Sequence, residues 1–200
     1  MTKAEFVRII QQSQKGDRAE FERIYKEYFG KIQTTAYFVV NDFDLAYDIA
    51  SEVILKLLIL RKDPTEIENH TAYIIRMTKN LSFDLIAKRD HEVSSEIISQ
   101  KDDASLIDPL WLDDIMKLLS EEKKDIFVLH YIWDRPFKKI SAQLNIPWGT
   151  VKARAAKIRQ KLKSHYEERR KYFRLFLFLY ILFFFLIRLL YRKIISEAEK

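Results

Sequence analysis

The stretch Phe137–Leu162, FKKISAQLNIPWGTVKARAAKIRQKL, predicts a short amphipathic helix, a tight turn and a strongly basic helix in succession. The first helix is expected at Phe137–Leu144, with Phe137, Ile140, Ser141 and Leu144 facing inward. Asn145 stands where the turn requires a positive φ, which Asn tolerates better than most residues. Pro147 suits the first turn of the following helix. This layout is typical of a helix-turn-helix DNA-binding motif.

The second helix of this motif carries polar donors on one side and apolar residues on the other. Its donors are Thr150, Lys152, Arg154, Lys157, Arg159, Lys161 and Lys163. Its apolar residues Val151, Ala155, Ile158 and Leu162 recur at helical spacing, so we expect them to be buried. The donors could bind phosphates and base edges. For the motif taken alone, a surface helix with a solvated basic face remains the alternative.

Composition restricts the class of protein. Three Gly and four Pro among 200 residues are too few for a sandwich or barrel, so an all-α fold is expected. Because the chain has no Cys, a disulfide framework, a thiol nucleophile and a Cys-based zinc site are excluded. The four His are scattered without metal-ligand spacing, and we expect no metal and no cofactor. No nucleophile–base arrangement or glycine-rich phosphate loop is present, which argues against an enzyme.

Charge is unevenly distributed along the chain. Residues 120–171 carry a net charge of +8, whereas residues 91–119 carry −5, within an overall charge of +6. A basic segment of this kind is the electrostatic footprint of nucleic-acid binding. The acidic segment is interpreted as a solvated linker, with electrostatic shielding of the basic module as a minor alternative.

Helical periodicity divides the chain into two small helical domains. In residues 1–90, helices are expected at residues 2–13, 17–40, 44–61 and 70–88, and Asp17 with Glu20 makes a capping-box-like start for the second of them. Residues 91–108 lack periodicity and are rich in Ser and Asp, which predicts a linker. In residues 109–170, helices beginning at Pro109 and at Glu121 precede the helix-turn-helix, and the second of them should run to Trp133 with Ser120 as its N-cap. A hydrophobic helix at residues 171–193 and a tail at residues 194–200 follow.

Two parts of the chain resemble the bacterial RNA polymerase sigma-70 family, in its extracytoplasmic-function type. Leu119–Tyr131 (LSEEKKDIFVLHY), together with the helix-turn-helix, resembles region 4 of that family. Phe21–Lys56 resembles region 2, including the Asp-rich entry Asn41 to Asp44 and the run Ala46 to Val53. Ala72–Arg89 (AYIIRMTKNLSFDLIAKR) resembles the segment with which the family opens and reads the downstream promoter element. The two modules occur in the family's order, and the resemblance covers about residues 5 to 168.

The resemblance implies a sigma factor that binds core RNA polymerase, through its β′ and β subunits, and directs it to promoter DNA. Polymerase would be bound by Asp48, Ser51 and Glu52, although the family more often has Gln where Ser51 stands. The downstream element would be bound by Arg76, Lys79, Asn80, Asp84, Lys88 and Arg89. An anti-sigma factor is a further possible partner. For the polar positions on the helix at residues 44–61, a merely solvated helix face is the alternative.

For the upstream promoter element, the matching family positions lie on the second helix of the motif. Thr150 and Arg154 would contact the phosphate backbone, and Lys152, Ala153 and Ala156 would face the base edges of the major groove, with Lys157 on the same basic side. Phosphate contacts fix the register, whereas base contacts specify the sequence. Two Ala among these positions leave few hydrogen-bonding readers, so Lys152, thymine-methyl contacts and DNA shape should determine the preference.

The C-terminal part departs from this resemblance. Residues 172–191 form a 20-residue segment, apolar except for Arg174 and Arg188, with Tyr at both ends. Twenty helical residues match the roughly 30 Å core of a bilayer, and the two Arg could extend to its interfaces. We expect a single membrane anchor that holds the protein at the cytoplasmic face of the bacterial inner membrane. A tail packed on the protein or on a partner, which would leave the protein cytoplasmic, is the alternative.

Two other functions fit parts of the sequence. The chain could be a membrane-tethered helix-turn-helix regulator that does not bind polymerase. It could also be a membrane signalling or scaffold protein whose helices contact only other proteins. Association with core polymerase separates the first alternative from a sigma factor, and salt-dependent DNA binding excludes the second.

Overall fold

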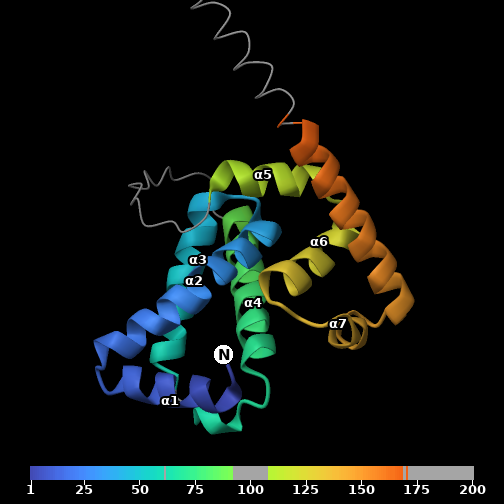
Figure 1. Ribbon diagram of the computed structural model, residues 1–200. Helices are drawn as coiled ribbons and strands as arrows, with labels where there is room; N and C mark the ends of the chain where they lie inside the picture. Colours follow the sequence, from blue (N-terminus) through green and yellow to red (C-terminus); the bar gives the residue numbers. More distant parts are fainter. Residues whose placement is uncertain (61, 92–107, 169, 171–200) are drawn as a thin grey trace, which may run out of the picture. The chain divides into compact units, whose positions relative to one another are not determined.

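The computed structural model describes residues 1–60, 62–91, 108–168 and 170 (Figure 1). Throughout these residues the regular structure is helical, which confirms the all-α prediction. No helix within the same ranges is long and apolar enough to cross a membrane. The anchor expected at residues 172–191, the hydrophobic helix at 171–193 and most of the predicted linker lie outside the described residues.

Five helices form the N-terminal part of the described chain: α1 (Lys3–Gln14), α2 (Arg18–Val40), α3 (Phe43–Leu58), the short 3-10 helix η1 (Pro64–Glu66) and α4 (His70–His91). The predicted bounds are close to these, except that the helix expected to reach residue 61 ends at Leu58. Asp17 caps α2 by accepting hydrogen bonds from the backbone N–H groups of Ala19 and Glu20, as the sequence suggested. Glu20 does not complete a capping box, because the backbone N–H of Asp17 donates to the carbonyl of Gln12 at 3.1 Å, while the carboxylate of Glu20 pairs with Arg8 at 2.8 Å.

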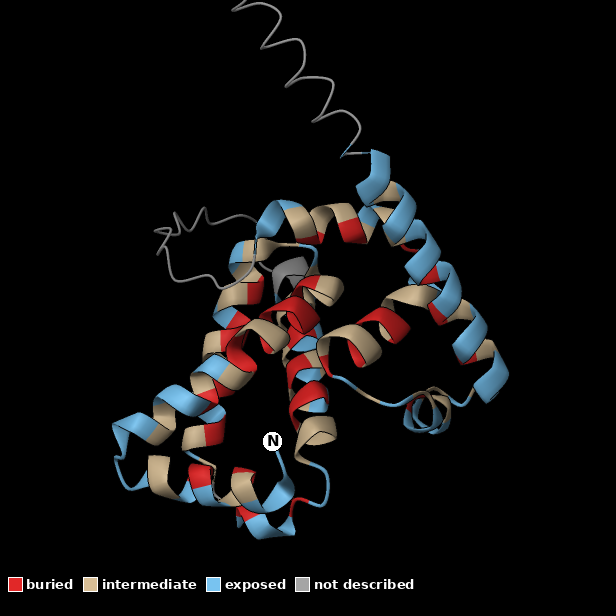
Figure 2. Cartoon of the chain, in the orientation of Figure 1, coloured by how far each residue is buried: buried red, intermediate tan, exposed pale blue. Residues whose placement is uncertain are grey.

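Helix α2 is the centre of this part. It packs against α1, α3 and α4, and Figure 2 shows buried residues along the facing sides of these helices. Ile24, Phe29 and Ile32 of α2 are almost fully buried, as are Ile49 and Leu57 of α3. Complete burial of one such side chain contributes about 1.5–3 kcal/mol. The register of α3 and α4 is therefore determined by their packing on α2, which presents the outer faces of both helices to solvent.

The C-terminal part of the described chain contains α5 (Pro109–Leu118), α6 (Glu121–Phe127), η2 (Val128–Ile132), α7 (Phe137–Leu144) and a helix at residues 148–168. Pro109 occupies the first turn of α5, as expected. The prediction of one continuous α-helix from Glu121 to Trp133 was wrong, because η2 is a π-helix. The backbone N–H of Trp133 reaches back five residues to the carbonyl of Val128 at 3.1 Å.

The described residues up to Ala155 form one compact unit, and a second unit begins at Ala156. Inside the first unit, α2 contacts η2 although about 100 residues separate them in sequence. The indole N–H of Trp133 donates a buried hydrogen bond of 2.8 Å to the hydroxyl of Thr35. Nearby, the rings of Phe38 and Phe127 stack with their centroids 5.5 Å apart. These contacts join the predicted first domain to the segment that precedes the helix-turn-helix.

Replacement of Trp133 by Phe should lower the free energy of unfolding by about 1–3 kcal/mol, because the donor to Thr35 and part of the buried ring are lost. Urea denaturation followed by circular dichroism measures the change. Trp148→Phe is the matched control, since Trp148 is 52% exposed and its replacement should change stability by less than about 0.5 kcal/mol. Equal effects of the two substitutions would show that the Trp133 bond contributes nothing specific.

Candidate functional site

The turn between α7 and the helix at residues 148–168 has the geometry of a helix-turn-helix. Asn145 ends α7 with φ of 53°, the left-handed conformation that the sequence predicted for it. The hydroxyl of Ser141 donates to the carbonyl of Ile146 at 2.7 Å, which ties the turn to α7. The carbonyl of Pro147 accepts from the backbone N–H groups of Thr150 and Val151 and so opens the next helix. We call residues 148–168 the recognition helix.

The recognition helix separates apolar and polar residues as its spacing predicted. Val151, Ala155 and Ile158 are fully buried, whereas Leu162 is half-buried. The predicted DNA-facing residues Lys152, Ala153, Ala156 and Lys157 are exposed, and Thr150 and Arg154 are partly buried. The guanidinium of Arg154 pairs with the carboxylate of Glu122 at 2.6 Å. In this state Arg154 therefore links the recognition helix to α6, and a phosphate would have to displace Glu122.

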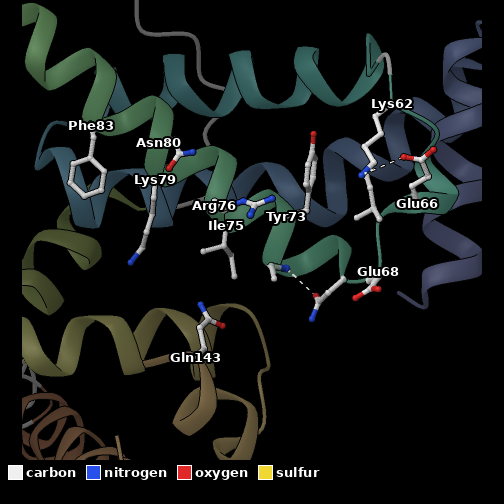
Figure 3. A pocket seen from close by; sticks show the side chains of 13 residues that line it. Lys62, Glu66, Glu68, Tyr73, Ile75, Arg76, Lys79, Asn80, Phe83 and Gln143 are labelled. Atoms are coloured by element: carbon white, nitrogen blue, oxygen red, sulfur yellow. Dashed lines mark hydrogen bonds and ion pairs between the residues drawn. The ribbon is translucent and has the colours of Figure 1, made fainter. Parts of the chain in front are cut away.

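A second polar surface surrounds a groove beside α4 (Figure 3). The groove has a volume of about 650 Å³ and is lined by residues of the loop 62–69, by α4 and by Gln143 of α7. Arg76, Lys79 and Asn80, three of the predicted downstream-element residues, lie along it. Asp84 and Lys88 are exposed further along α4 and do not line it, and Arg89 is described only as part of the helix.

Several residues that line the groove already form ion pairs or hydrogen bonds with side chains of residues 125–143. The ammonium of Lys79 pairs with the carboxylate of Asp125 at 2.7 Å. Arg135 donates to the side-chain oxygen of Asn69 at 3.1 Å and to that of Gln143 at 3.3 Å. Burial lowers the pKa of Arg135, but a guanidinium stays charged at neutral pH. A nucleic acid entering the groove would therefore compete with Asp125 for Lys79.

The predicted polymerase-binding residues lie on α3. Asp48 is exposed and Glu52 pairs with Lys56 at 3.0 Å within the helix. The hydroxyl of Ser51 donates to the carbonyl of Tyr47 at 3.0 Å, so this donor is already used inside α3. Sequence reasoning missed Leu55 and Ile59, which are 57% and 73% exposed. The spacing of positions 48, 52, 55 and 59 places all four on one helical face, and this periodicity could have revealed them.

Two exposed aromatic residues were also missed. Phe83 is 59% exposed at the groove beside α4, and Trp148 is 52% exposed at the start of the recognition helix. Both lie four residues from a predicted DNA-binding lysine, Lys79 and Lys152 respectively. That spacing places each pair on one helical face, which is the signal that could have identified them.

Comparison with known proteins agrees with the geometry. Residues 110–162 match the family described as Sigma-70, region 4. The ECF RNA polymerase sigma factor SigW of Bacillus subtilis (strain 168) is 29% identical over 175 residues, covering 78% of this chain and 93% of the relative. Residues 110–162 are thus similar to a sigma-70 region 4, and most of the chain is similar to an extracytoplasmic-function sigma factor, in agreement with the all-α fold and the helix-turn-helix.

Replacement of Asp125 by Asn should strengthen binding of single-stranded DNA about two- to fivefold, because Lys79 loses its competing carboxylate. Fluorescence anisotropy with a labelled oligonucleotide at fixed salt measures the affinity. Asp113→Asn is the control, since it removes one equal charge from a pair with Lys117 on α5. If both variants strengthened binding equally, overall charge would explain the change and the groove would not.

Proposed function

We propose that the protein is a sigma factor. It would bind core RNA polymerase through α3, read an upstream promoter element with the recognition helix, and hold an opened downstream element in the groove beside α4. The observation that carries the proposal is the helix-turn-helix, with Val151 and Ala155 buried and Lys152 and Ala153 exposed. In motifs of this kind, the N-terminal part of the second helix meets base edges in the major groove. In vitro transcription with core polymerase on a genomic promoter library tests the whole proposal.

The upstream element is assigned to residues at the start of the recognition helix. Lys152 and Ala153 would face the bases, with Ala156 one turn further on, while Thr150, Arg154 and Lys157 would contact phosphates. Lysine can donate to the N7 and O6 acceptors of guanine, and the methyl groups of alanine can contact the methyl group of thymine. With these contacts, the base preference in the upstream element would depend chiefly on Lys152.

The downstream element is assigned to the groove because it combines cationic, amide and aromatic side chains. Arg76 and Lys79 supply positive charge, Asn80 supplies an amide, and Tyr73 and Phe83 supply rings. Unpaired bases bind by stacking on rings and by hydrogen bonds along their exposed edges, within a positively charged track. Asp84, Lys88 and Arg89 would extend this track along α4.

The polymerase-binding surface is assigned to the face of α3 that carries Asp48, Glu52 and Leu55 and that continues into Ile59, the C-cap residue of α3, with Ser51 beside it. Exposed apolar side chains next to charged ones are typical of a protein interface, in which a few buried residues contribute most of the binding energy. Leu55 and Ile59 would supply the apolar contact, and the two carboxylates would set the orientation. No catalytic residue is part of this proposal.

Reversal of both charges, Asp48→Lys with Glu52→Lys, should weaken association with core polymerase at least about tenfold. The reason is that two lysines would then face the cationic groups of the polymerase that complement the carboxylates. Co-purification and titration with core enzyme measure association, and circular dichroism checks the fold. Glu22→Lys is the control, since Glu22 forms a similar pair with Lys26 on α2. Unchanged association of the folded double variant would refute the assignment to α3.

We further propose that residues 172–191 anchor the factor at the cytoplasmic face of the inner membrane. The support is the sequence, with 20 residues that are apolar except for Arg174 and Arg188, preceded by the basic segment 157–171. Positive charge beside a spanning helix favours the cytoplasmic side, where promoter DNA is found. An anchor there would restrict access of the recognition helix to DNA.

The full-length chain should fractionate with membranes and resist extraction by high salt, because the attachment is apolar. A chain ending at Arg170 should be soluble and at least as active in transcription with core polymerase. Fractionation, followed by transcription with the two chains at equal concentration, measures both properties. Full-length protein that is entirely soluble without detergent or a partner would instead support a packed tail.

A further inference from the structure

Trp148 is an exposed aromatic residue for which the fold gives no packing reason. It is the first residue of the recognition helix and remains 52% exposed. A tryptophan normally buries a large area in a core or an interface. Single exposed apolar residues are common, so exposure alone assigns no role. The neighbour of Trp148 is the informative feature.

The ammonium of Lys152 lies over the ring of Trp148, with Nζ 5.2 Å from the ring centroid. This is cation–π geometry, and Trp is the strongest aromatic partner for a cation. Lys152 follows Trp148 by four residues, so the two share a helical face, and Lys152 has no carboxylate partner among the described ion pairs. The ring is therefore the contact that restricts the rotamers of an otherwise free lysine.

The contact with the ring also determines the direction in which the Lys152 side chain extends. It extends back toward Trp148, that is, toward the N-terminal end of the recognition helix. In helix-turn-helix proteins this end approaches the base edges. An ammonium has three donors, so it can rest on a ring and still donate to an acceptor such as N7 or O6 of guanine.

We infer that Trp148 is a positioning residue for Lys152: its ring fixes where the ammonium stands in the major groove and hence which base pair the lysine discriminates. The inference rests on the proposed DNA-reading role of the recognition helix. Trp148 itself is not proposed to contact a base. Since Ala153 and Ala156 cannot donate hydrogen bonds from their side chains, the position of one lysine determines much of the upstream preference.

The test measures base preference with the full-length chain and core polymerase. Duplexes varied one base pair at a time across the upstream element compete for binding, and Lys152→Ala first identifies the base pair that the lysine reads. At that base pair, Trp148→Ala should reduce discrimination about two- to fivefold, which is the effect of an exposed cation–π contact of about 0.5–1 kcal/mol. Other base pairs should keep their ranking.

Two substitutions at position 148 distinguish the effect of the aromatic ring from the effect of apolar volume. Trp148→Phe keeps an aromatic face and should retain most of the discrimination, whereas Trp148→Leu keeps only apolar volume and should behave like Trp148→Ala. In the double variant, Trp148→Ala should add nothing to Lys152→Ala, because both changes remove one interaction. Leu110→Ala, which removes a side chain that is 74% exposed on α5, is the control for loss of an exposed apolar group.

Several outcomes would overturn the inference. Additive losses in the double variant would show that Trp148 acts independently of Lys152. If Trp148→Leu kept as much base discrimination as Trp148→Phe, the apolar volume of the side chain would matter and the aromatic ring would not. If Lys152→Ala changed no base preference, both the inference and the assigned role of Lys152 would fail, whereas promoter-directed transcription by the unaltered chain would still support the wider function.

Discussion

The hydrogen bond from the indole of Trp133 to Thr35 is the constraint on which the arrangement of the first compact unit depends. The hydroxyl of Thr35 donates to the carbonyl of Lys31 at 2.7 Å, which leaves its lone pairs to accept from the indole at 2.8 Å. Both groups are buried, and a buried donor without a partner costs about 1–3 kcal/mol. The stacked ring pairs Tyr28–Trp133 and Phe38–Phe127 add apolar contact, which has little directionality, whereas the hydrogen bond requires a defined donor–acceptor geometry.

The π-helix η2 makes that bond possible. One additional residue in the turn rotates everything after it by about 100° relative to an unbroken α-helix. Trp133 follows this turn, and Asp134 then takes a positive φ of 50° before Arg135 reaches Asn69. In a regular α-helix over Glu121–Trp133, the indole of Trp133 would be rotated by about 100° relative to its position here, which would remove the geometry of its bond to Thr35. A local irregularity therefore places α7, and with it Gln143, at the edge of the groove beside α4.

The sequence could predict features that depend on neighbouring residues and could not predict those that depend on distant ones. Asp17 as a cap, Pro109 at a helix start and Asn145 in the left-handed turn are local choices, and all three were predicted correctly. The π-helix was not predicted, because the sequence VLHYI has no property that separates it from an α-helix.

Long-range contacts could not be predicted from the sequence. The pairs Lys79–Asp125 and Arg154–Glu122 join residues 46 and 32 positions apart, and no periodicity reveals such contacts. Leu55 and Ile59 were predictable, since their spacing from Asp48 and Glu52 is helical.

Both of these ion pairs draw their carboxylates from the same seven-residue helix, α6. Asp125 holds Lys79 of the groove, and Glu122 holds Arg154 of the recognition helix, so one short acidic segment neutralises a cation in each proposed DNA-binding surface. The carboxylate side chains are 49% and 70% exposed, and surface pairs of this kind contribute about 0–1 kcal/mol. A phosphate can therefore displace them at small cost. Before DNA binds, the pairs order two flexible cations, but each carboxylate also competes with a phosphate for its cation, and this competition is the larger effect because an ordered lysine or arginine that is already paired must first give up its partner.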